Sequence, residues 1–400
     1  MNNQNQDTPV HIRLWHHEFW LLVIADMLLT MSVYMLIPTF PQWLMDCQHF
    51  TPQQTGLSMA AFAVGLYLFG GQCSWLVQRF RRNVVCMWTI VALALNVLLL
   101  GYFSPLTTFP RALLQRLALG AAFGLAQMIL SSTLIIDTCE SHQRTEANFG
   151  SAWFSRFALS LGPVAGLAIA MMPVNRYLMS LGCQLSQITP VLFFSGIMAL
   201  LSMLLISRVS FPFRTPEEGV SVASLDRFFL PSSTLLFINL LLISLTVGMV
   251  LTLSLSLAFY ALMMGGFLLA LLAQRFVFLN AELKSEVISG LFLMLAALLV
   301  LLYYPNSLMS PLLLGTSIGI VSSRFLLFFV KLSRHCQRGT SQSTYFLGWE
   351  TGLALGLGLG YGLFCQSSDL LIYTCLVITS TALLMYHFLT HSWFLKHKNR

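Results

Sequence analysis

Residues 191–250 read VLFFSGIMALLSMLLISRVSFPFRTPEEGVSVASLDRFFLPSSTLLFINLLLISLTVGMV, and this stretch decides the fold. It holds one apolar run, a polar segment over residues 208–227 that contains prolines, arginines and glutamates, and a second apolar run. A membrane-spanning helix needs about 20 predominantly apolar residues, so each run is long enough to form one. A polar segment among membrane helices predicts a linker between two halves of a duplicated membrane protein.

The composition of the whole chain agrees with this interpretation. Apolar residues make up 57% of the 400 residues and charged residues only 9%, and the mean hydropathy is +0.78. Soluble domains carry about 25% charged residues, so this chain lacks the polar surface to face water all round. The composition excludes a soluble enzyme, a disordered chain and a module that binds nucleic acid. The net charge of +7 is better explained by loops beside a lipid bilayer.

Apolar runs separated by polar or Pro/Gly breaks predict an all-α polytopic membrane protein. It has twelve transmembrane helices in two pseudo-symmetric six-helix bundles, with an N-terminal bundle at 1–207, a cytoplasmic linker at 208–227 and a C-terminal bundle at 228–400. The seventh and eighth helices merge into one apolar stretch, so a break near residues 250–254 is inferred. The predicted spans are 19–40, 54–77, 84–104, 111–135, 149–171, 188–207, 230–250, 253–274, 287–304, 310–330, 346–365 and 369–390.

Basic residues predict the orientation of these helices. Sixteen of the 21 Lys and Arg residues fall on the side that carries both termini. This bias predicts cytoplasmic termini and a multi-pass protein of the inner (cytoplasmic) membrane. The two on the opposite side are Arg111 and Arg176, and the three within helices are Arg116, Arg156 and Arg324. The sixteen are Arg13, Arg79, Arg81, Arg82, Arg144, Arg208, Arg214, Arg227, Arg275, Lys284, Lys331, Arg334, Arg338, Lys396, Lys398 and Arg400.

The fifth and eleventh predicted helices repeat one pattern. A Trp and two Gly residues recur with an offset of 196, from 153, 162 and 166 to 349, 358 and 362. A Gln-Arg pair ahead of them recurs with an offset of 194, from 143–144 to 337–338. The difference predicts that the second loop gained two residues. Equivalence of the fifth and eleventh helices is what two parallel halves of six helices require.

Two motifs connect the chain to a known family. Residues 74–83, between the second and third helices, read SWLVQRFRRN, and the fourth helix carries Arg116-Leu-Ala-Leu-Gly120. With the twelve-helix layout, they resemble the major facilitator superfamily, in whose loop signature Arg79 and Arg82 match while a glutamine replaces the aspartate. The resemblance implies that this loop locks the two halves by charge pairing. A plain positive-inside loop is the alternative.

The fifth helix carries a third motif. Gly162-Pro163 and Gly166 are similar to the G-x-x-x-G-P-x-x-G-G pattern of proton-coupled drug antiporters of the superfamily, from which Ala158 and Leu167 depart. The two glycines allow another helix to approach closely, and the proline frees a carbonyl and bends the helix. The resemblance implies efflux, whereas simple close packing is compatible with either direction of transport.

The fourth helix also carries a polar stripe. Arg116, Gly120, Gly124, Gln127 and Ser131 recur every three or four residues and therefore share one face. An arginine in the hydrocarbon layer is costly unless it faces a wet cavity or a partner. We therefore expect Arg116 and Gln127 to line a substrate cavity. Snorkelling of the arginine toward the interface is the alternative.

The first helix carries the acid most suited to proton coupling. Asp26, Thr30 and Tyr34 recur every four residues and form one polar face, which we expect to line the cavity. A carboxyl group inside the membrane is accommodated more readily when it is protonated, which suits a proton carrier. A structural acid near the interface is the alternative.

Further embedded charges complete the predicted site. Arg156 and Arg324 are expected to line the cavity and suit an anionic substrate, or to pair with the embedded acids. Gly356 and Gly360 belong to a glycine-rich eleventh helix that predicts a tightly packed, sliding contact. Glu350, at the predicted cytoplasmic end of that helix, is interpreted as interfacial or, if it faces the cavity, as the second candidate for proton coupling.

These features predict a secondary active transporter that moves a small organic molecule by alternating access, as a functional monomer without cofactor or metal. Proton-coupled efflux is the leading hypothesis. Proton-coupled uptake of a sugar, nucleoside or organic anion is the alternative. A lipid-modifying membrane enzyme has no supporting GxSxG or HExxH motif, and an ATP-driven pump has no GxxxxGK[ST] loop. One adjacent His and Cys are too few for zinc.

Overall fold

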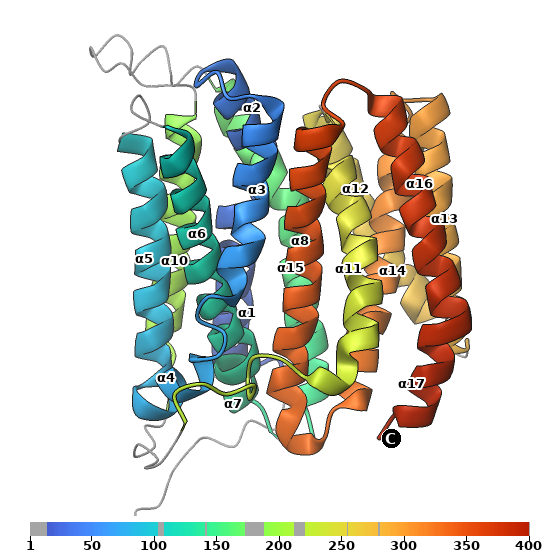
Figure 1. The fold of residues 1–400 in the computed structure, drawn as a ribbon. Coiled ribbons are helices and arrows are strands. Elements are labelled where there is room, and N and C mark those ends of the chain that lie inside the picture. The colour runs from blue at the N-terminus through green and yellow to red at the C-terminus, as the bar shows by residue number, and fades with distance from the viewer. Residues whose placement is uncertain are drawn as a thin grey trace, which may run out of the picture.

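The computed structural model describes residues 14–102, 108–140, 142–172, 188–211, 221–253, 255–278 and 281–399. Long helices stand side by side in one bundle (Figure 1), and the described residues contain no strand. Most of the predicted loop 172–187 and residues 212–220 of the predicted linker lie outside the described residues, together with Arg13, Arg176, Arg214 and Arg400.

Six long helices form the first half of the described chain. They are α1 (His17–Tyr34), α3 (Pro52–Tyr67), α5 (Arg82–Tyr102), α6 (Phe109–Ile129), α8 (Arg144–Met171) and α10 (Thr189–Ser207). A π-helical turn at Leu130–Leu134 joins α6 to the short α7 (Ile135–Asp137). Two further short helices, α2 (Phe40–Asp46) and α4 (Cys73–Arg79), lie in the connections.

Six long helices also form the second half. They are α11 (Thr234–Val250), α12 (Leu257–Leu272), α13 (Leu283–Tyr303), α14 (Met309–Leu332), α15 (Arg338–Leu363) and α16 (Ser368–Met385). A π-helical turn at Tyr386–Thr390 leads from α16 into α17 (His391–His397). In Figure 1, α4, α7 and α17 lie at one end of the bundle and α2 at the other. We call these the linker end and the far end.

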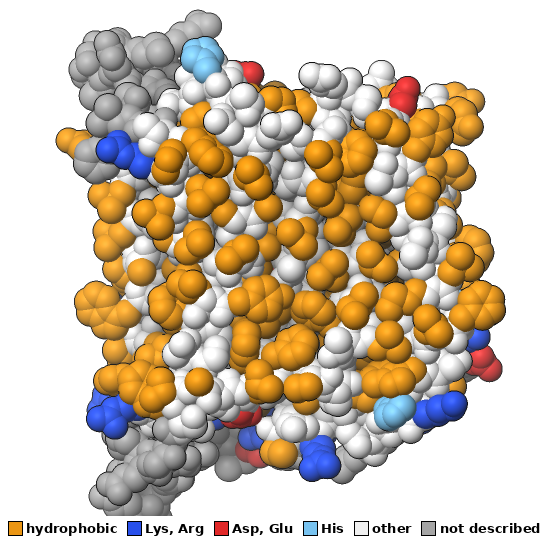
Figure 2. All heavy atoms as spheres, viewed as in Figure 1, with side chains coloured by type: hydrophobic (Ala, Val, Ile, Leu, Met, Phe, Trp, Pro, Cys, Tyr) orange, Lys and Arg blue, Asp and Glu red, His pale blue; other side chains and the backbone are white. Residues whose placement is uncertain are grey.

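The twelve long helices confirm the predicted fold class. Within the described residues, 10 helices are long and apolar enough to cross a membrane. The other two are α3, which has 16 residues, and the glycine-rich α15, most of whose residues are buried. Hydrophobic side chains cover the middle of the face in Figure 2, and Lys and Arg gather mainly near the linker end. An interior helix such as α15 needs no apolar surface toward lipid, which explains its polar and glycine content.

The helix boundaries confirm one prediction from the sequence and correct two others. The predicted break between the seventh and eighth helices is confirmed, because α11 ends at Val250 and Ser256 caps α12. The first helix was predicted to reach residue 40, but α1 ends at Tyr34 and α2 follows. The eleventh was predicted to begin at residue 346, whereas α15 begins at Arg338. Its buried first two turns are polar, so hydropathy did not include them.

The internal repeat follows one offset, and the predicted gain of two residues is wrong. Helices α8 and α15 begin at Arg144 and Arg338, 194 positions apart, each after a Gln. On this register Gly162 corresponds to Gly356, and each packs on the first helix of its own half: Gly162 on Tyr34 of α1, and Gly356 on α11. Gly358 and Gly362, the partners under the 196 offset, face α3 of the other half instead. The Trp153–Trp349 match is therefore coincidental.

Candidate functional site

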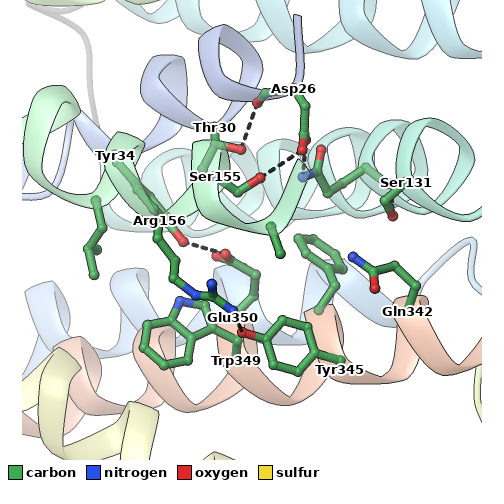
Figure 3. A pocket seen from close by; sticks show the side chains of 14 residues that line it. Asp26, Thr30, Tyr34, Ser131, Ser155, Arg156, Gln342, Tyr345, Trp349 and Glu350 are labelled. Carbon is green, nitrogen blue, oxygen red and sulfur yellow. Dashed lines mark hydrogen bonds between the residues drawn. The ribbon is translucent and has the colours of Figure 1, made fainter. Parts of the chain in front are cut away.

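A small cavity of about 50 Å³ lies between the two halves. Its walls come from α1, from α6 with the π-helical turn, and from α8 on one side and α15 on the other (Figure 3). The central cavity, as we call it, is lined by Asp26, Thr30, Tyr34, Gln127, Ser131, Ala152, Ser155, Arg156, Leu159, Gln342, Tyr345, Phe346, Trp349 and Glu350.

Asp26 lies in the wall of the central cavity and is only 1% exposed. Its carboxylate accepts hydrogen bonds from Gln127 Nε2 at 2.5 Å, Ser151 Oγ at 2.6 Å and Ser155 Oγ at 2.7 Å. Thr30 Oγ1 donates to the backbone carbonyl of Asp26 at 2.9 Å. The polar faces predicted on the first and fourth helices thus meet at one acid, and α8 adds two serines that the sequence analysis did not single out.

Glu350 lines the central cavity from α15, on the opposite side, and is 3% exposed. The hydroxyl of Tyr34 donates a hydrogen bond to its carboxylate, which links α1 of the first half to α15 of the second (Figure 3). The prediction that Glu350 is interfacial is wrong, because α15 begins eight residues before its predicted start and Glu350 falls in the middle of it. A cross-half hydrogen bond of this kind has to break or move when the halves separate.

Tyr34 and Glu350 also border a second, smaller cavity on the far-end side. It is lined by Val33, Tyr34, Ile37, Met59, Phe62, Arg116, Glu350, Leu353, Ala354 and Leu357. Arg116 therefore lies inside the protein, 3% exposed, but in the second cavity rather than the central one. Its guanidinium lies 4.8 Å from the centre of the Phe40 ring, and Nη2 lies 3.0 Å from Met59 Sδ.

Arg156 reaches the central cavity from α8. Its Nη2 donates to the hydroxyl of Tyr345 at 3.1 Å, and its guanidinium lies 4.9 Å from the centre of the Trp153 ring. The side chain is 5% exposed. It contacts the opposite half through a neutral tyrosine, and no ion pair joins it to Asp26 or Glu350 in the described part of the chain.

The structure places Arg324 outside both cavities. It forms an ion pair with Glu286 of α13, which is buried. The sequence analysis missed this acid because the predicted span began one residue later, at 287. An embedded arginine needs a buried partner, so Arg324 was itself the signal to search for one. Arg324 therefore does not line the central cavity, contrary to the prediction.

The loop between the second and third helices lies at the linker end. Arg82 forms an ion pair with Asp137 of α7, and Arg79 is exposed at the end of α4. Nearby, Asp226 accepts hydrogen bonds from Ser74 Oγ at 3.2 Å and Thr340 Oγ1 at 3.1 Å, which joins α4 to α15. An acid from the linker thus connects the loop between the second and third helices to the second half.

Arg227 extends this polar group, which we call the linker clasp (Asp226, Arg227, Ser74, Thr133 and Thr340). Its Nη1 donates to Thr133 Oγ1 at 3.1 Å, and its backbone N–H donates to Thr340 Oγ1 at 2.9 Å. Burial lowers the pKa of the Arg227 guanidinium, as does the positive charge of Arg82, while Asp226 and Asp137 partly offset this. The clasp therefore joins the two halves at the linker end.

The predicted glycine motifs occupy close helix contacts. Gly120 faces the α3 backbone at Phe62 and Gly65, and Gly166 faces Met35 beyond the end of α1. Pro163 lies inside α8, and Gly360 faces Thr252 beyond the end of α11. These contacts lie within one half, so these glycines set the internal packing of each half. Among the described residues, no group of three His, Cys, Asp or Glu side chains could hold a metal ion.

Twelve long helices in the described part of the chain, in two related halves around a polar interior cavity, are the arrangement of a membrane transporter. Residues 22–357 match the family model of the Major Facilitator Superfamily, and the chain belongs to this superfamily. It is therefore a transporter rather than an enzyme. No curated protein matches the sequence.

Solved structures share the fold. A bacterial homolog of the human lysosomal transporter Spinster, inward-facing and unoccupied, superposes with a TM-score of 0.70 at 15% identity over 96% of this chain and 98% of that chain. The human organic anion transporter MFSD10 (TETRAN) gives 0.65 at 15% identity over 92% and 98%. The inward-open xylose transporter XylE from E. coli gives 0.64 at 15% identity over 93% and 95%. At such identities the likeness shows the fold alone.

Proposed function

We propose that this protein is a proton-coupled transporter of a small organic molecule, with the central cavity as its substrate site. The observation that supports this is two buried carboxyl groups, Asp26 and Glu350, in one cavity between the halves. Each is held by neutral donors, so each can gain and lose a proton without breaking an ion pair. A neutral acid costs less to enclose in the membrane than a charged one, which links protonation to the rocking of the halves.

Export is the direction we propose first, on the resemblance of the glycine–proline motif around Pro163 to that of drug antiporters. Protons entering from outside would then displace substrate from the cavity. Import with protons is the second candidate. It is favoured by the buried cations Arg116 and Arg156, which suit a negatively charged substrate. Both proposals place the protein in the inner membrane as a functional monomer.

Susceptibility profiling tests the proposal. A host strain lacking the gene and the same strain expressing it are compared on a panel of antimicrobial compounds and dyes, with and without a proton uncoupler. Export predicts protection against at least one compound, lost with the uncoupler and with Asp26→Asn. Import predicts that expression makes the cells more sensitive to at least one compound, and that this sensitivity is lost with the uncoupler and with Asp26→Asn. An effect that survives both the uncoupler and the substitution would contradict proton coupling at this acid.

Cysteine labelling tests the proposed orientation. Single cysteines in the 172–187 loop should react with a membrane-impermeant maleimide added to whole cells, and cysteines in the 208–227 linker should react only after the cells are opened. The sixteen-to-two distribution of basic residues motivates this expectation. The reverse labelling pattern would place both termini outside.

A further inference from the structure

The guanidinium of Arg156 is only partly satisfied. Its Nη2 donates to Tyr345, but Nε and Nη1 are buried and have no hydrogen-bond partner among the described residues. A buried donor without a partner, and especially a charged one, is destabilising. Figure 3 shows this side chain extending into the central cavity between α8 and α15. The unpaired N–H groups therefore lie where a ligand can reach them.

Two other arginines have acid partners, whereas Arg116 in the second cavity, like Arg156, has none among the described residues. Arg324 pairs with Glu286, and Arg82 pairs with Asp137. The acids of the central cavity are instead held by neutral groups: Asp26 by a glutamine and two serines, and Glu350 by a tyrosine. Within the described part of the chain, Arg156 therefore forms no ion pair with either acid of its cavity.

We propose that Arg156 binds the anionic group of the substrate, and that the substrate is an organic anion with a planar apolar or aromatic body. A guanidinium binds carboxylates with directional, charge-assisted hydrogen bonds. The wall of α15 opposite presents Tyr345, Phe346 and Trp349, which suit an aromatic or apolar body. The inference rests on the proposed function only in taking the central cavity as the substrate site.

The charge balance of the cavity links the anion to protons. The titratable groups that line it with Arg156 are Asp26 and Tyr34 on α1, and Tyr345 and Glu350 on α15. With both carboxyl groups ionised, one cation faces two anions, and a bound carboxylate adds a third. Protonation of one acid cancels the charge that the bound carboxylate adds. The anion therefore binds together with a proton, which corresponds to the import candidate.

Equilibrium binding to the full-length protein in lipid nanodiscs tests this inference. The probes are three compounds of one shape: 2-naphthoate, its neutral amide 2-naphthamide, and the cation 2-naphthylmethylammonium. We expect calorimetry to show naphthoate binding about 10- to 100-fold more tightly than the amide, with the cation weakest. Arg156→Gln should bring naphthoate to the level of the amide. Glu350→Gln, which imitates the protonated acid, should tighten naphthoate binding.

Two further variants keep the test decisive. Arg156→Lys retains the charge and loses the planar fork, so it should show an intermediate preference even if Arg156→Gln folds poorly. The double variant Glu286→Gln with Arg324→Gln removes an embedded charge pair outside the cavity and should keep the wild-type preference. A melting curve of each variant reports whether it is folded.

The inference is overturned if the amide or the cation binds as tightly as naphthoate, if folded Arg156→Gln keeps the preference, or if naphthoate does not bind at millimolar concentration. Binding is measured without a proton gradient. A transporter of anions that lacks proton coupling would therefore still show the preference, and a proton-coupled transporter of cations would not.

Discussion

Helices α8 and α15 occupy equivalent places in the two halves but carry opposite charges toward the cavity. On the register of 194 residues that joins Arg144 to Arg338, Arg156 corresponds to Glu350. Both line the central cavity, and the tyrosine hydroxyl bonded to each comes from the opposite half: Tyr345 for the arginine and Tyr34 for the glutamate. The backbone frame repeats, whereas the chemistry placed on it does not.

The helices that pack behind them differ in the same way. Helix α1 packs on α8 and brings Asp26 to the cavity. Helix α11 packs on α15 in the same manner, but it carries no acidic or basic residue between Thr234 and Val250. The comparison teaches that small residues at the helix contacts set the symmetric frame. A few polar side chains then place Asp26 on α1 of the first half, with no charged counterpart on α11 of the second.

The acid of α1 gives the largest expected effect. Asp26→Asn should abolish uphill transport driven by a pH gradient while leaving downhill exchange. Asparagine keeps the neighbours Gln127, Ser151 and Ser155, but its amide does not gain or lose a proton in the course of transport. Asp26→Glu should retain part of the uphill activity. The measurement is transport of the compound identified by susceptibility profiling into or out of membrane vesicles. The Glu286→Gln, Arg324→Gln double variant is the control. Full uphill activity of the Asn variant would move the proton site to Glu350.

The next largest effects are expected at Tyr34 and Tyr345, the two tyrosines whose hydroxyl groups bond to the opposite half. Tyr34→Phe removes the hydrogen-bond donor of a buried carboxylate, a loss of about 1–3 kcal/mol, so we expect transport to fall about 10-fold or more. Tyr345→Phe should cost only a few-fold, because Arg156 also packs on Trp153 and binds the substrate. Initial rates of transport, corrected for protein amount, measure both. Equal losses would show that the two hydroxyls have the same role in the cycle.

Neighbouring glycines of α15 separate packing within a half from packing between halves. A Cβ at position 356 would lie 2.8 Å from Met249 N in the same half, so Gly356→Ala should lower the free energy of unfolding by about 1–3 kcal/mol. A Cβ at position 358 would lie 2.8 Å from the Cβ of Ala60 in the other half, a contact that opening relieves.

We therefore expect Gly358→Ala to keep most of the stability and to favour opening at the far end. Thermal unfolding in detergent measures the first effect. Alkylation of a Val33→Cys variant in the second cavity, made without the exposed native cysteines, measures the second. A larger loss of stability in Gly358→Ala than in Gly356→Ala would contradict this division.

The linker clasp gives the smallest expected effect. Asp226→Ala removes the acceptor of two hydrogen bonds, from Ser74 and Thr340, near the surface. Such bonds contribute about 0.5–1.5 kcal/mol each, so the rate of cysteine alkylation from the linker end should rise about 2- to 10-fold. Ser221→Ala in the same linker serves as the control. An unchanged alkylation rate would show that the clasp does not hold this end closed.

Several site residues could be predicted because they follow helix periodicity. Asp26, Thr30 and Tyr34 recur every four residues, so they had to share a face, and all three line the central cavity. Gln127 was placed on the cavity face of its helix by the same argument. The serines of α8 were missed because an isolated serine in an apolar helix carries no signal. With an offset of 194 residues, Ser155 corresponds to Trp349, and both line the central cavity. The coincidental match of Trp153 with Trp349 favoured an offset of 196 and concealed this correspondence.

Partners in space could not be predicted, because they depend on which helices meet. The same reasoning grouped Arg116, Arg156 and Arg324 as embedded cations, yet they lie in the second cavity, in the central cavity and outside both. Glu350 was left between an interfacial and a cavity-facing interpretation because hydropathy ends a helix where polar residues begin. In the interior of a bundle, polar residues can continue a helix because other helices, and not lipid, surround them.

The sequence by itself determined the all-helical membrane fold class and the polar faces on the first and fourth helices. These properties follow from local composition and from the period of the α-helix, which no tertiary contact can change. Only the tertiary structure decided that Tyr34 bonds to Glu350, that Arg324 has its own acid and that Arg156 has none among the described residues. Those outcomes depend on contacts between residues far apart in the chain, and a side chain's burial and charge partners exist only once the helices have packed.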